Sequence, residues 1–162
     1  MSERLKNKKE RWLTTTSVAL AIRNSDRSRS RSSLLLVCKK NSGQWGLPAG
    51  GLLKGEQLEE AAYRELREET GLGPDDVTNF IRPKIIVIPG EIKTSIGLIY
   101  ITSMNKPLPS EGIVPNSDEI KLVRPFTINE LFGLLRRPEE IYKPGFNIPA
   151  IKFWLEFFRT PY

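Results

Sequence analysis

The sequence lacks histidine entirely and contains a single cysteine, Cys38, among its 162 residues. Without histidine there is no serine–histidine triad and no histidine-ligated zinc site. One thiol excludes an intramolecular disulfide framework and suits a reducing compartment. Cys38 follows the apolar run "SSLLLV", and no histidine is available to activate it. We therefore interpret Cys38 as a buried strand residue rather than a nucleophile.

Long hydrophobic runs are also missing. No stretch of about 20 apolar residues, the length needed to cross a bilayer, occurs in the chain. The first residues lack the apolar core of a signal peptide. Apolar residues make up 39% of the chain and charged residues 27%, which is typical of a globular protein rather than a disordered one. We therefore expect a cytoplasmic protein without a membrane partner.

Acidic residues are outnumbered by basic ones, which gives a net charge of +6 and a pI near 9.5. This surplus is compatible with acidic partners such as nucleotides or nucleic acid, but it demonstrates none of them. Much of it lies in segments 3–12 and 23–32, which we interpret as solvated. We assign residues 1–12 to a basic N-terminal arm and residues 13–162 to one domain of ordinary size.

The hydrophobic pattern changes irregularly between that of strands and that of helices. Apolar runs predict strands at 15–24, 33–40, 84–90, 95–104 and 120–127, with a short extended piece around Trp45. Apolar spacings of three and four predict helices at 57–70, 128–137 and 147–160. We expect the first two strands to pair as a long-looped hairpin, and the rest of the glycine-rich segment 41–51 to be turn. This mixture predicts an α/β fold with helices on the faces of a mixed sheet.

The segment "RELREETG" places Glu65, Glu68 and Glu69 within five residues. On a helix, positions i, i+3 and i+4 share one face, so these carboxylates repel one another. Arg64 offsets only part of that charge, and hard oxygen ligands at this spacing suit Mg²⁺ or Mn²⁺. The repulsion costs only about 0.2–0.5 kcal/mol per pair. A solvated, ion-paired helix face is therefore the alternative for these residues taken alone.

The glutamates belong to a longer pattern that starts at Gly50. Its nine fixed positions are Gly50, Glu56, Arg64, Glu65, Leu66, Glu68, Glu69, Gly71 and Leu72. In this spacing the chain resembles the Nudix hydrolase family, and the resemblance extends over about residues 13–160. It implies a Nudix-type α/β/α sandwich with a mixed β-sheet between helices. It also implies a metal-dependent pyrophosphohydrolase in which water attacks phosphorus, with Mg²⁺ or Mn²⁺ as cofactor.

The resemblance implies a role for each acid of this pattern. Glu65, Glu68 and Glu69 match the family's metal-binding carboxylates. Glu56 matches the first acid of this pattern from Gly50 to Leu72, which we call the box, and the backbone carbonyl of Gly50 matches a further metal contact. Glu65 is either a metal ligand or the base that deprotonates the attacking water, since family members differ on this point.

Two further residues take part in catalysis by the same resemblance. Arg64 matches the position that orients the neighbouring carboxylates through a charge-assisted contact. A later loop acid often completes the site; Glu119 fits best by context, with Glu111 and Glu91 as alternatives. The predicted catalytic set is Glu65, Arg64, Glu68 and Glu119.

Four residues near the box are candidates for contact with the substrate, namely Trp45, Gly51, Phe146 and Asn147. Gly51 belongs to the turn "PAGG", whose backbone can approach phosphates because no Cβ intervenes. Trp45 is either a base-stacking platform or a core residue. Phe146 and Asn147 lie where several family members build the base pocket, and a simple loop and helix cap is the alternative.

The resemblance leaves the substrate open between a nucleoside triphosphate and a nucleoside diphosphate derivative. An RNA 5′-end pyrophosphohydrolase is an alternative because of the positive charge, although RNA-acting relatives usually carry "PQGG" where this chain has "PAGG". A non-catalytic nucleotide-binding module is another alternative. Degenerate members usually lose box carboxylates, however, and this chain keeps all of them. Because the family is often dimeric, a homodimer is also left open.

Overall fold

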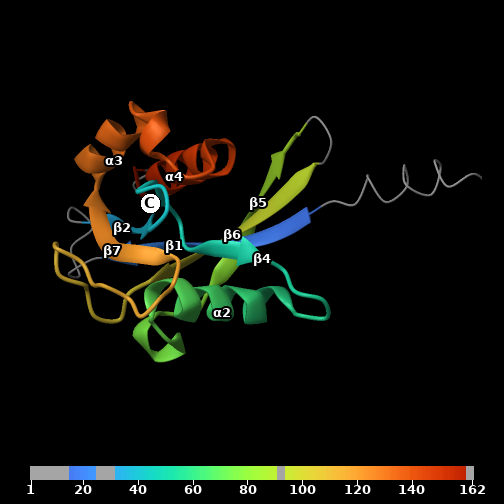
Figure 1. Cartoon of the computed structure of the whole chain (residues 1–162). Helices are drawn as coiled ribbons and strands as arrows, with labels where there is room; N and C mark the ends of the chain where they lie inside the picture. The colour runs from blue at the N-terminus through green and yellow to red at the C-terminus, as the bar shows by residue number, and fades with distance from the viewer. Residues whose placement is uncertain (1–14, 25–31, 91–93, 160–162) are drawn as a thin grey trace, which may run out of the picture.

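A computed structural model describes residues 15–24, 32–90 and 94–159 (Figure 1). The basic arm at 1–12, most of the Ser/Arg segment 25–32 and the alternative acid Glu91 lie outside the described residues. The strands are β1 (Thr15–Asn24), β2 (Ser33–Lys39), β3 (Trp45–Gly46), β4 (Ala49–Gly51), β5 (Ile81–Ile88), β6 (Ser95–Ser103) and β7 (Ile120–Thr127). The helices are α2 (Leu58–Thr70), α3 (Ile128–Leu135) and α4 (Pro144–Arg159), with 3₁₀ turns at Pro74–Asp76 and Pro138–Glu140. None of these described helices combines the length and the apolarity that crossing a bilayer requires.

Strand β1 is the centre of the sheet. It runs parallel to β6 from Thr15, opposite Ser95, to Arg23, opposite Ser103. The expected antiparallel pairing with β2 is confirmed, but only over the last two residues of β1. The other residues of these two strands have different partners: β4 pairs with earlier residues of β1, and β3 pairs with later residues of β2. Within the described residues the strand order is β3-β2-β1-β6-β5, with β4 on β1 and β7 on β2.

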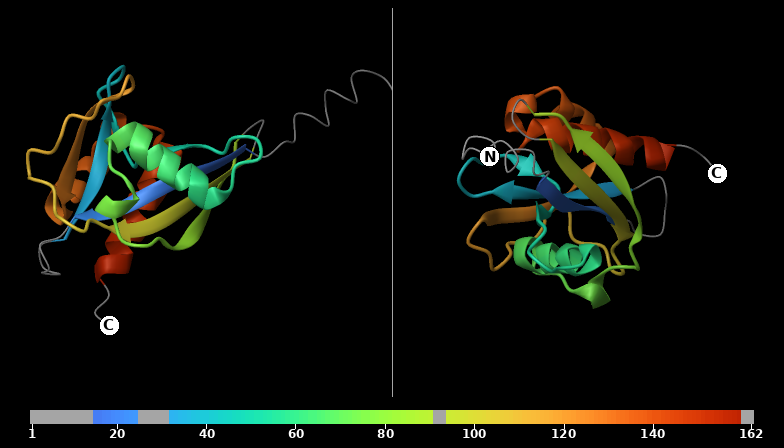
Figure 2. Two further views of the ribbon diagram at one scale, coloured as in Figure 1. Left: turned by 90° about the horizontal axis from the view of Figure 1, so that it is seen from below. Right: turned by 90° about the vertical axis from the view of Figure 1, so that its right-hand side faces the viewer.

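Alternate residues of β1 contribute to two cores on opposite faces of the sheet. Val18, Leu20 and Ile22 pack with Ala62 and Leu66 of α2. The intervening residues of β1 pack in a second core together with α3 and α4. Figures 1 and 2 show α2 on one face of the sheet and α3 and α4 on the other. The predicted α/β/α sandwich with a mixed sheet between helices is thus confirmed.

Helix α2 begins and ends where its local chemistry predicts. Gln57 is the N-cap, and its backbone N–H donates to the Glu60 carboxylate at 2.9 Å. Gly71 ends the helix in the left-handed conformation, with φ of 75°, which glycine adopts without a Cβ penalty. Ala62 and Leu66 of the predicted apolar stripe are fully buried. The helix that carries the box is therefore fixed at both ends and along one face.

The largest differences from the sequence prediction concern α4, β4 and β5. Helix α4 begins at Pro144 rather than at Asn147, because the fixed φ of proline suits the first helical position. Phe146 and Asn147 therefore lie in the first turn of α4 and not in a loop. Strand β4 occupies part of the expected turn, since it pairs with β1. Strand β5 begins at Ile81, three residues before its predicted start, with an irregular register next to β6.

Candidate active site

The acidic face of α2 lies against β4. Gly50 pairs with Val18 of β1, and a Cβ placed on Gly50 would overlap the Glu65 carboxylate. Only glycine allows this close approach. Gly51 has open space where its Cβ would be, and its carbonyl accepts a hydrogen bond from Arg64 Nη2 at 2.8 Å. The backbone of β4 and the first buried carboxylate of α2 are therefore adjacent.

Arg64 joins the predicted acids into one cluster. Its Nε and Nη2 donate to the two oxygens of Glu56 at 2.7 and 3.0 Å. Its Nη1 donates to Glu65 and, at 3.4 Å, to Glu68. A forked contact of guanidinium and carboxylate fixes orientation as well as charge. Arg64 thus holds three carboxylates and the Gly51 carbonyl together.

Glu56 secures the loop that precedes α2. Its Oε2 accepts a hydrogen bond from the Leu53 N–H at 2.9 Å. The hydrogen bond from Arg64, followed by that from Leu53, lowers the pKa of Glu56 below its ordinary range. The same contact raises the pKa of the Arg64 guanidinium. Both shifts favour the charged forms, so this pair stays ionised near neutral pH.

Glu65 and Glu69 are both buried, with 6% and 5% of their surface exposed. Burial raises the pKa of Glu65, and the hydrogen bond from Arg64 opposes that shift. Burial also raises the pKa of Glu69, opposed by its pairing with Lys39, while the charge of Glu119 raises it further. In both residues the charged carboxylate is disfavoured by its surroundings. Additional positive charge would therefore stabilise the ionised pair.

Lys39, which is not among the site residues predicted from the sequence, lies beside Glu69. Its ammonium donates to Glu69 Oε1 and stands 5.0 Å from the centre of the Tyr142 ring. The other oxygen of Glu69 accepts from the Ala49 N–H at 2.9 Å. Lys39 is the last residue of β2, after a run of buried residues. That change from apolar to basic at the end of a buried strand is the sequence signal that marks it.

The remaining predicted acids are exposed. The side chain of Glu68 is 59% exposed. Glu119 is exposed in the loop before β7, and its charge acts on Glu69. Glu111 is exposed in the same loop, where its carboxylate accepts a hydrogen bond from Ser110 at 3.4 Å. The charge of Glu119 thus reaches the box, whereas Glu111 interacts with its own neighbour.

The donor atoms of this site suit a hard divalent cation. Among the residues that the structure describes, no three acidic or cysteine side chains are arranged to hold a metal ion directly; Glu65 pairs with Arg64 and Glu69 with Lys39. The available donors are nevertheless carboxylate and carbonyl oxygens of α2 and β4, the ligands that Mg²⁺ and Mn²⁺ prefer. The missing Cβ of Gly50 brings one carboxylate up to the backbone of β4. The residues present therefore fit such a cation.

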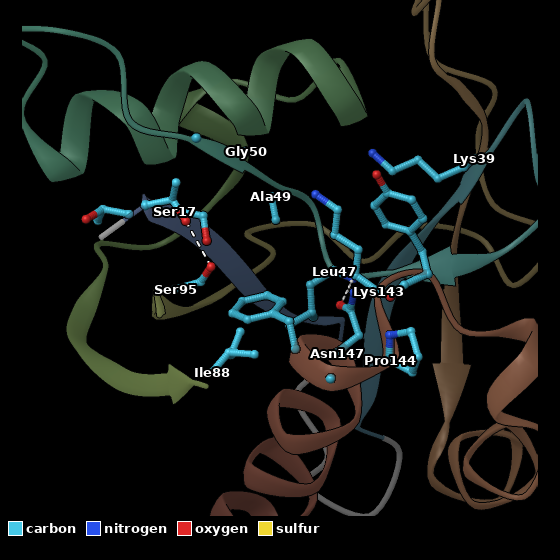
Figure 3. Close-up of a pocket in the computed structure, with 16 residues that line it drawn as sticks. Ser17, Lys39, Leu47, Ala49, Gly50, Ile88, Ser95, Lys143, Pro144 and Asn147 are labelled. Atoms are coloured by element: carbon cyan, nitrogen blue, oxygen red, sulfur yellow. Dashed lines mark hydrogen bonds between the residues drawn. The ribbon is translucent and has the colours of Figure 1, made fainter. Parts of the chain in front are cut away.

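A cavity of about 530 Å³ lies beside β4 (Figure 3). Its lining combines apolar, hydroxyl and basic side chains, among them Leu47, Ile88, Phe146, Thr15, Ser17, Ser95, Lys39 and Lys143. None of the described residues that line it is acidic. A volume of roughly 300–1,000 Å³ is usual for small-molecule sites. The cavity is thus large enough for a nucleotide, and its charge suits an anion.

Three of the four predicted substrate contacts line this cavity, namely Gly51, Phe146 and Asn147. Trp45 is not part of the lining. Its ring packs edge-on against Phe126 with centroids 4.8 Å apart. The guanidinium of Arg124 stands 5.5 Å from the centre of the same ring. Trp45 therefore packs at the rim of the core in this structure, outside the lining of the cavity.

The side-chain amide of Asn147 forms hydrogen bonds within the fold. Its Oδ1 accepts from the Leu47 N–H at 2.8 Å, and its Nδ2 donates to the Tyr142 carbonyl at 2.5 Å. A Cβ on Gly46 would press against this amide. Asn147 therefore fixes the start of α4 against the chain that leads into β4. Tyr142 also lines the cavity, and no local sequence pattern marks it.

Cys38 is buried in β2, as expected. Its thiol donates to the Gly43 carbonyl at 3.4 Å. Burial raises the pKa of the thiol, which disfavours the reactive thiolate. The interpretation of Cys38 as a buried strand residue is confirmed.

The model of the NUDIX domain family matches residues 13–146 of this chain. Among curated proteins, the RNA pyrophosphohydrolase of Erythrobacter litoralis is 56% identical over 39 residues, which is 24% of this chain and 24% of that protein. The RNA pyrophosphohydrolase of Aeromonas hydrophila is 56% identical over 41 residues, 24% of this chain and 23% of that protein. The match thus spans about a quarter of the length of these curated relatives.

Solved structures share the fold at low sequence identity. The Nudix hydrolase RenU of M. Smegmatis superposes with a TM-score of 0.68 and 19% identity, over 90% of this chain and 86% of that chain. The C. elegans Ap4A hydrolase superposes with a TM-score of 0.61 and 16% identity, over 89% of this chain and 97% of that chain. At these identities the likeness concerns the fold alone.

Proposed function

The chain belongs to the NUDIX domain family, and we propose that it is a metal-dependent pyrophosphohydrolase acting on a nucleotide with a diphosphate linkage. The observation that carries this proposal is the cluster in which Arg64 gathers Glu56, Glu65 and Glu68 next to a cavity of about 530 Å³. Carboxylates that suit a divalent cation, placed beside a cavity of ligand size, support hydrolysis at phosphorus.

Mg²⁺ or Mn²⁺ is the cofactor in this proposal. Glu68 and Glu69 would hold it, with Glu56 and the Gly50 carbonyl as further oxygen donors. When bound, the cation screens the acids from the phosphate oxygens and stabilises the charge that develops at phosphorus.

The residues of the chain orient the site and accept a proton. Arg64 fixes the position of Glu65. We assign Glu65 as the base: its carboxylate accepts a proton from the attacking water while a new phosphorus–oxygen bond forms and the bond to the bridging oxygen breaks. Burial raises the pKa of Glu65, which makes it a stronger base than an exposed glutamate. Glu119 adds a second acid near Glu69.

The cavity determines how the nucleotide is held. Its apolar surface around Phe146 suits a nucleobase, and the hydroxyls of Ser17 and Ser95 suit a sugar. Asn147 holds the wall of the cavity through its bonds to Leu47 and to the Tyr142 carbonyl. The substrate in this proposal is a nucleoside triphosphate or a nucleoside diphosphate derivative.

The 5′ end of RNA is a second candidate substrate. The two curated relatives described above are named RNA pyrophosphohydrolases. A net charge of +6 suits the phosphate backbone of a nucleic acid. Binding to triphosphorylated RNA that weakens steeply with salt would favour this candidate, and no binding at low salt would eliminate it.

Release of phosphate or pyrophosphate from a panel of substrates tests the proposal. The panel contains nucleoside triphosphates, ADP-ribose, nucleotide sugars, dinucleoside polyphosphates and triphosphorylated RNA. Each is measured with Mg²⁺, with EDTA, and with Glu68→Gln. We expect turnover of one class that is lost in EDTA and reduced by several powers of ten in Glu68→Gln. Undiminished turnover in both controls would contradict a metal-dependent site on α2.

Two further properties accompany this proposal. The single cysteine and the lack of long apolar runs favour a place in the cytoplasm. The family resemblance favours a homodimer, and sedimentation of the purified chain would test it.

A further inference from the structure

Lys39 and Glu69 form an ion pair at the edge of the cavity. Their side chains are 13% and 6% exposed, and Lys39 is part of the cavity lining. Glu69 is also one of the carboxylates that we assign to a divalent cation. An ammonium fixed on this carboxylate repels a second cation at the same oxygen. The pair therefore opposes the metal that the box would hold.

Tyr142 gives Lys39 a second contact. The ammonium groups of Lys39 and Lys143 stand 5.0 and 5.3 Å from the centre of the Tyr142 ring. The face of an aromatic ring attracts cations. Figure 3 shows both lysine side chains reaching into the same side of the cavity. Two ammonium groups thus gather beside the box, where none of the described lining residues is acidic.

The backbone holds Tyr142 and Lys143 in place. The N–H of Tyr142 donates to the Trp45 carbonyl at 2.8 Å, and its carbonyl accepts from the Asn147 amide at 2.5 Å. Lys143 has φ of 41°, in the left-handed region that residues other than glycine rarely adopt. Its carbonyl accepts the N–H groups of Phe146 and Asn147, both at 3.0 Å. An unusual conformation held by surrounding hydrogen bonds motivates a functional hypothesis.

We propose that Lys39 is an internal counter-cation: it neutralises Glu69 in the metal-free protein and binds the substrate's phosphate, beside Lys143, once a divalent cation occupies the box. This proposal rests on the function proposed above. It makes Lys39, Tyr142 and Lys143 a binding site for the anionic part of the substrate. Metal and phosphate binding are then coupled, because both act on the same ammonium group.

The coupling has two opposite signs. Lys39 competes with the cation for Glu69, so removal of its charge tightens cation binding when no phosphate ligand is present. Lys39 also attracts the phosphate, so removal of its charge weakens phosphate binding when the cation is present. If the ion pair of Lys39 and Glu69 had a purely structural role, removal of the Lys39 charge would not weaken phosphate binding.

The first sign, competition between Lys39 and the cation for Glu69, is tested by the binding of Mn²⁺ alone. Paramagnetic resonance of free Mn²⁺ and calorimetry measure this binding. We expect Lys39→Met to bind Mn²⁺ about tenfold more tightly than the unaltered chain, and Mn²⁺ to raise its Tm by a larger amount. Lys39→Arg keeps the charge and should bind Mn²⁺ no more tightly than the unaltered chain. Lys152→Met removes one charge from an exposed position of α4 and controls for net charge.

Inorganic pyrophosphate, titrated by calorimetry at saturating Mg²⁺, tests the second sign. Lys39→Met and Lys143→Met should each weaken its binding by about fivefold or more. Lys152→Met should leave it unchanged. Lys143→Met should also leave the binding of Mn²⁺ alone unchanged, because Glu69 pairs with Lys39.

The outcomes separate this inference from the proposed function. If neither the unaltered chain nor any variant binds Mn²⁺, the proposed function fails. If Mn²⁺ binds the unaltered chain and Lys39→Met equally, or if Lys152→Met shows the same change, the counter-cation role is overturned while the metal site stands. Lys39→Gln, which removes the charge but keeps a polar side chain with N–H donors, replaces Lys39→Met if that variant does not fold, and the same order of affinities is expected.

Discussion

Two buried glutamates, one turn apart on α2, are neutralised in different ways. Glu65 pairs with Arg64, its neighbour in the sequence, whereas Glu69 pairs with Lys39, 30 residues earlier at the end of β2. Arg64 also binds Glu56 and is fixed by several acceptors, whereas Lys39 faces the cavity. One acid therefore has a partner supplied by its own helix, and the other has a partner supplied by the tertiary fold. The first arrangement suits a fixed base, and the second suits an exchangeable ligand.

Replacing each glutamate by glutamine tests the difference between Glu65 and Glu69, and gives the largest expected effect. Glu65→Gln should lower turnover by about 10²–10⁴-fold, because it removes the proposed proton acceptor and keeps the side-chain shape. Glu69→Gln should also lower turnover but keep the rise of rate with pH that the base produces. Rates measured across pH, with circular dichroism as the control for folding, distinguish the two. A Glu65→Gln enzyme with most of its activity would eliminate Glu65 as the base.

Gly50→Ala tests the contact that the Glu65 carboxylate makes with β4. The added Cβ would overlap that carboxylate, so we expect the free energy of unfolding to fall by about 1–3 kcal/mol, with loss of activity. Gly51→Ala is the matched control, since a Cβ there meets open space, and its effect should stay within about 0.5 kcal/mol. Urea unfolding of both variants gives the two values. Equal losses would show that the approach of Glu65 to Gly50 is unimportant.

Arg64→Lys gives Glu65 the same kind of partner that Glu69 has, a lysine. A lysine cannot reproduce the forked contact with Glu56 and the bond to the Gly51 carbonyl. We expect turnover to fall about tenfold and stability to fall by about 1–2 kcal/mol. Steady-state rates and urea unfolding measure the two effects. Unchanged kinetics would mean that a single positive charge at this position is sufficient.

Acidity gives the smallest effect, with opposite signs for Glu56 and Glu65, two of the carboxylates that Arg64 binds. Its hydrogen bond lowers the pKa of Glu56, so this pairing stabilises the fold above the ordinary glutamate pKa of about 4.5 and loses its effect as pH falls through the lowered pKa. Burial raises the pKa of Glu65. Protonated Glu65 therefore contributes to the stability of the fold below the ordinary glutamate pKa, and this contribution is lost as pH rises through the raised pKa.

Thermal unfolding of the metal-free chain between about pH 3 and 8 measures both contributions. Glu56→Gln should lower Tm near neutral pH and match the unaltered chain at the acidic end. Glu65→Gln should improve relative to the unaltered chain as pH rises. Parallel curves for the two variants would contradict the opposite pKa shifts of Glu56 and Glu65.

The site could be predicted from sequence wherever its parts are contiguous. The family assignment and the α/β/α sandwich are confirmed, because the box from Gly50 to Leu72 carries its spacing, its helix and its C-terminal glycine in one segment. The strands followed from apolar runs that the sheet buries. Local chemistry also determines how Arg64 meets Glu68, since a helix places positions i and i+4 on one face.

The parts that depend on tertiary contacts could not be predicted. Nothing in the local pattern around Lys39 or Tyr142 indicates that β2 and the start of α4 meet beside Glu69. The parallel pairing of β1 with β6 is equally invisible to periodicity, which reports faces and not neighbours. The roles of Glu119 and of the substrate contacts, and the assignment of residues 13–162 to one domain, stay predictions.

The parallel pairing of β1 and β6 has a consequence for how the chain folds. Thr15 lies beside Ser95, 80 residues further along the sequence. Closing so long a loop slows folding relative to a sheet of hairpins. During synthesis one edge of β1 stays unpaired until β6 has left the ribosome. Because β1 is apolar on both faces, this unpaired edge can associate with other chains. Substitutions in β6 should therefore limit the yield of folded protein more than substitutions in the residues that carry the chemistry.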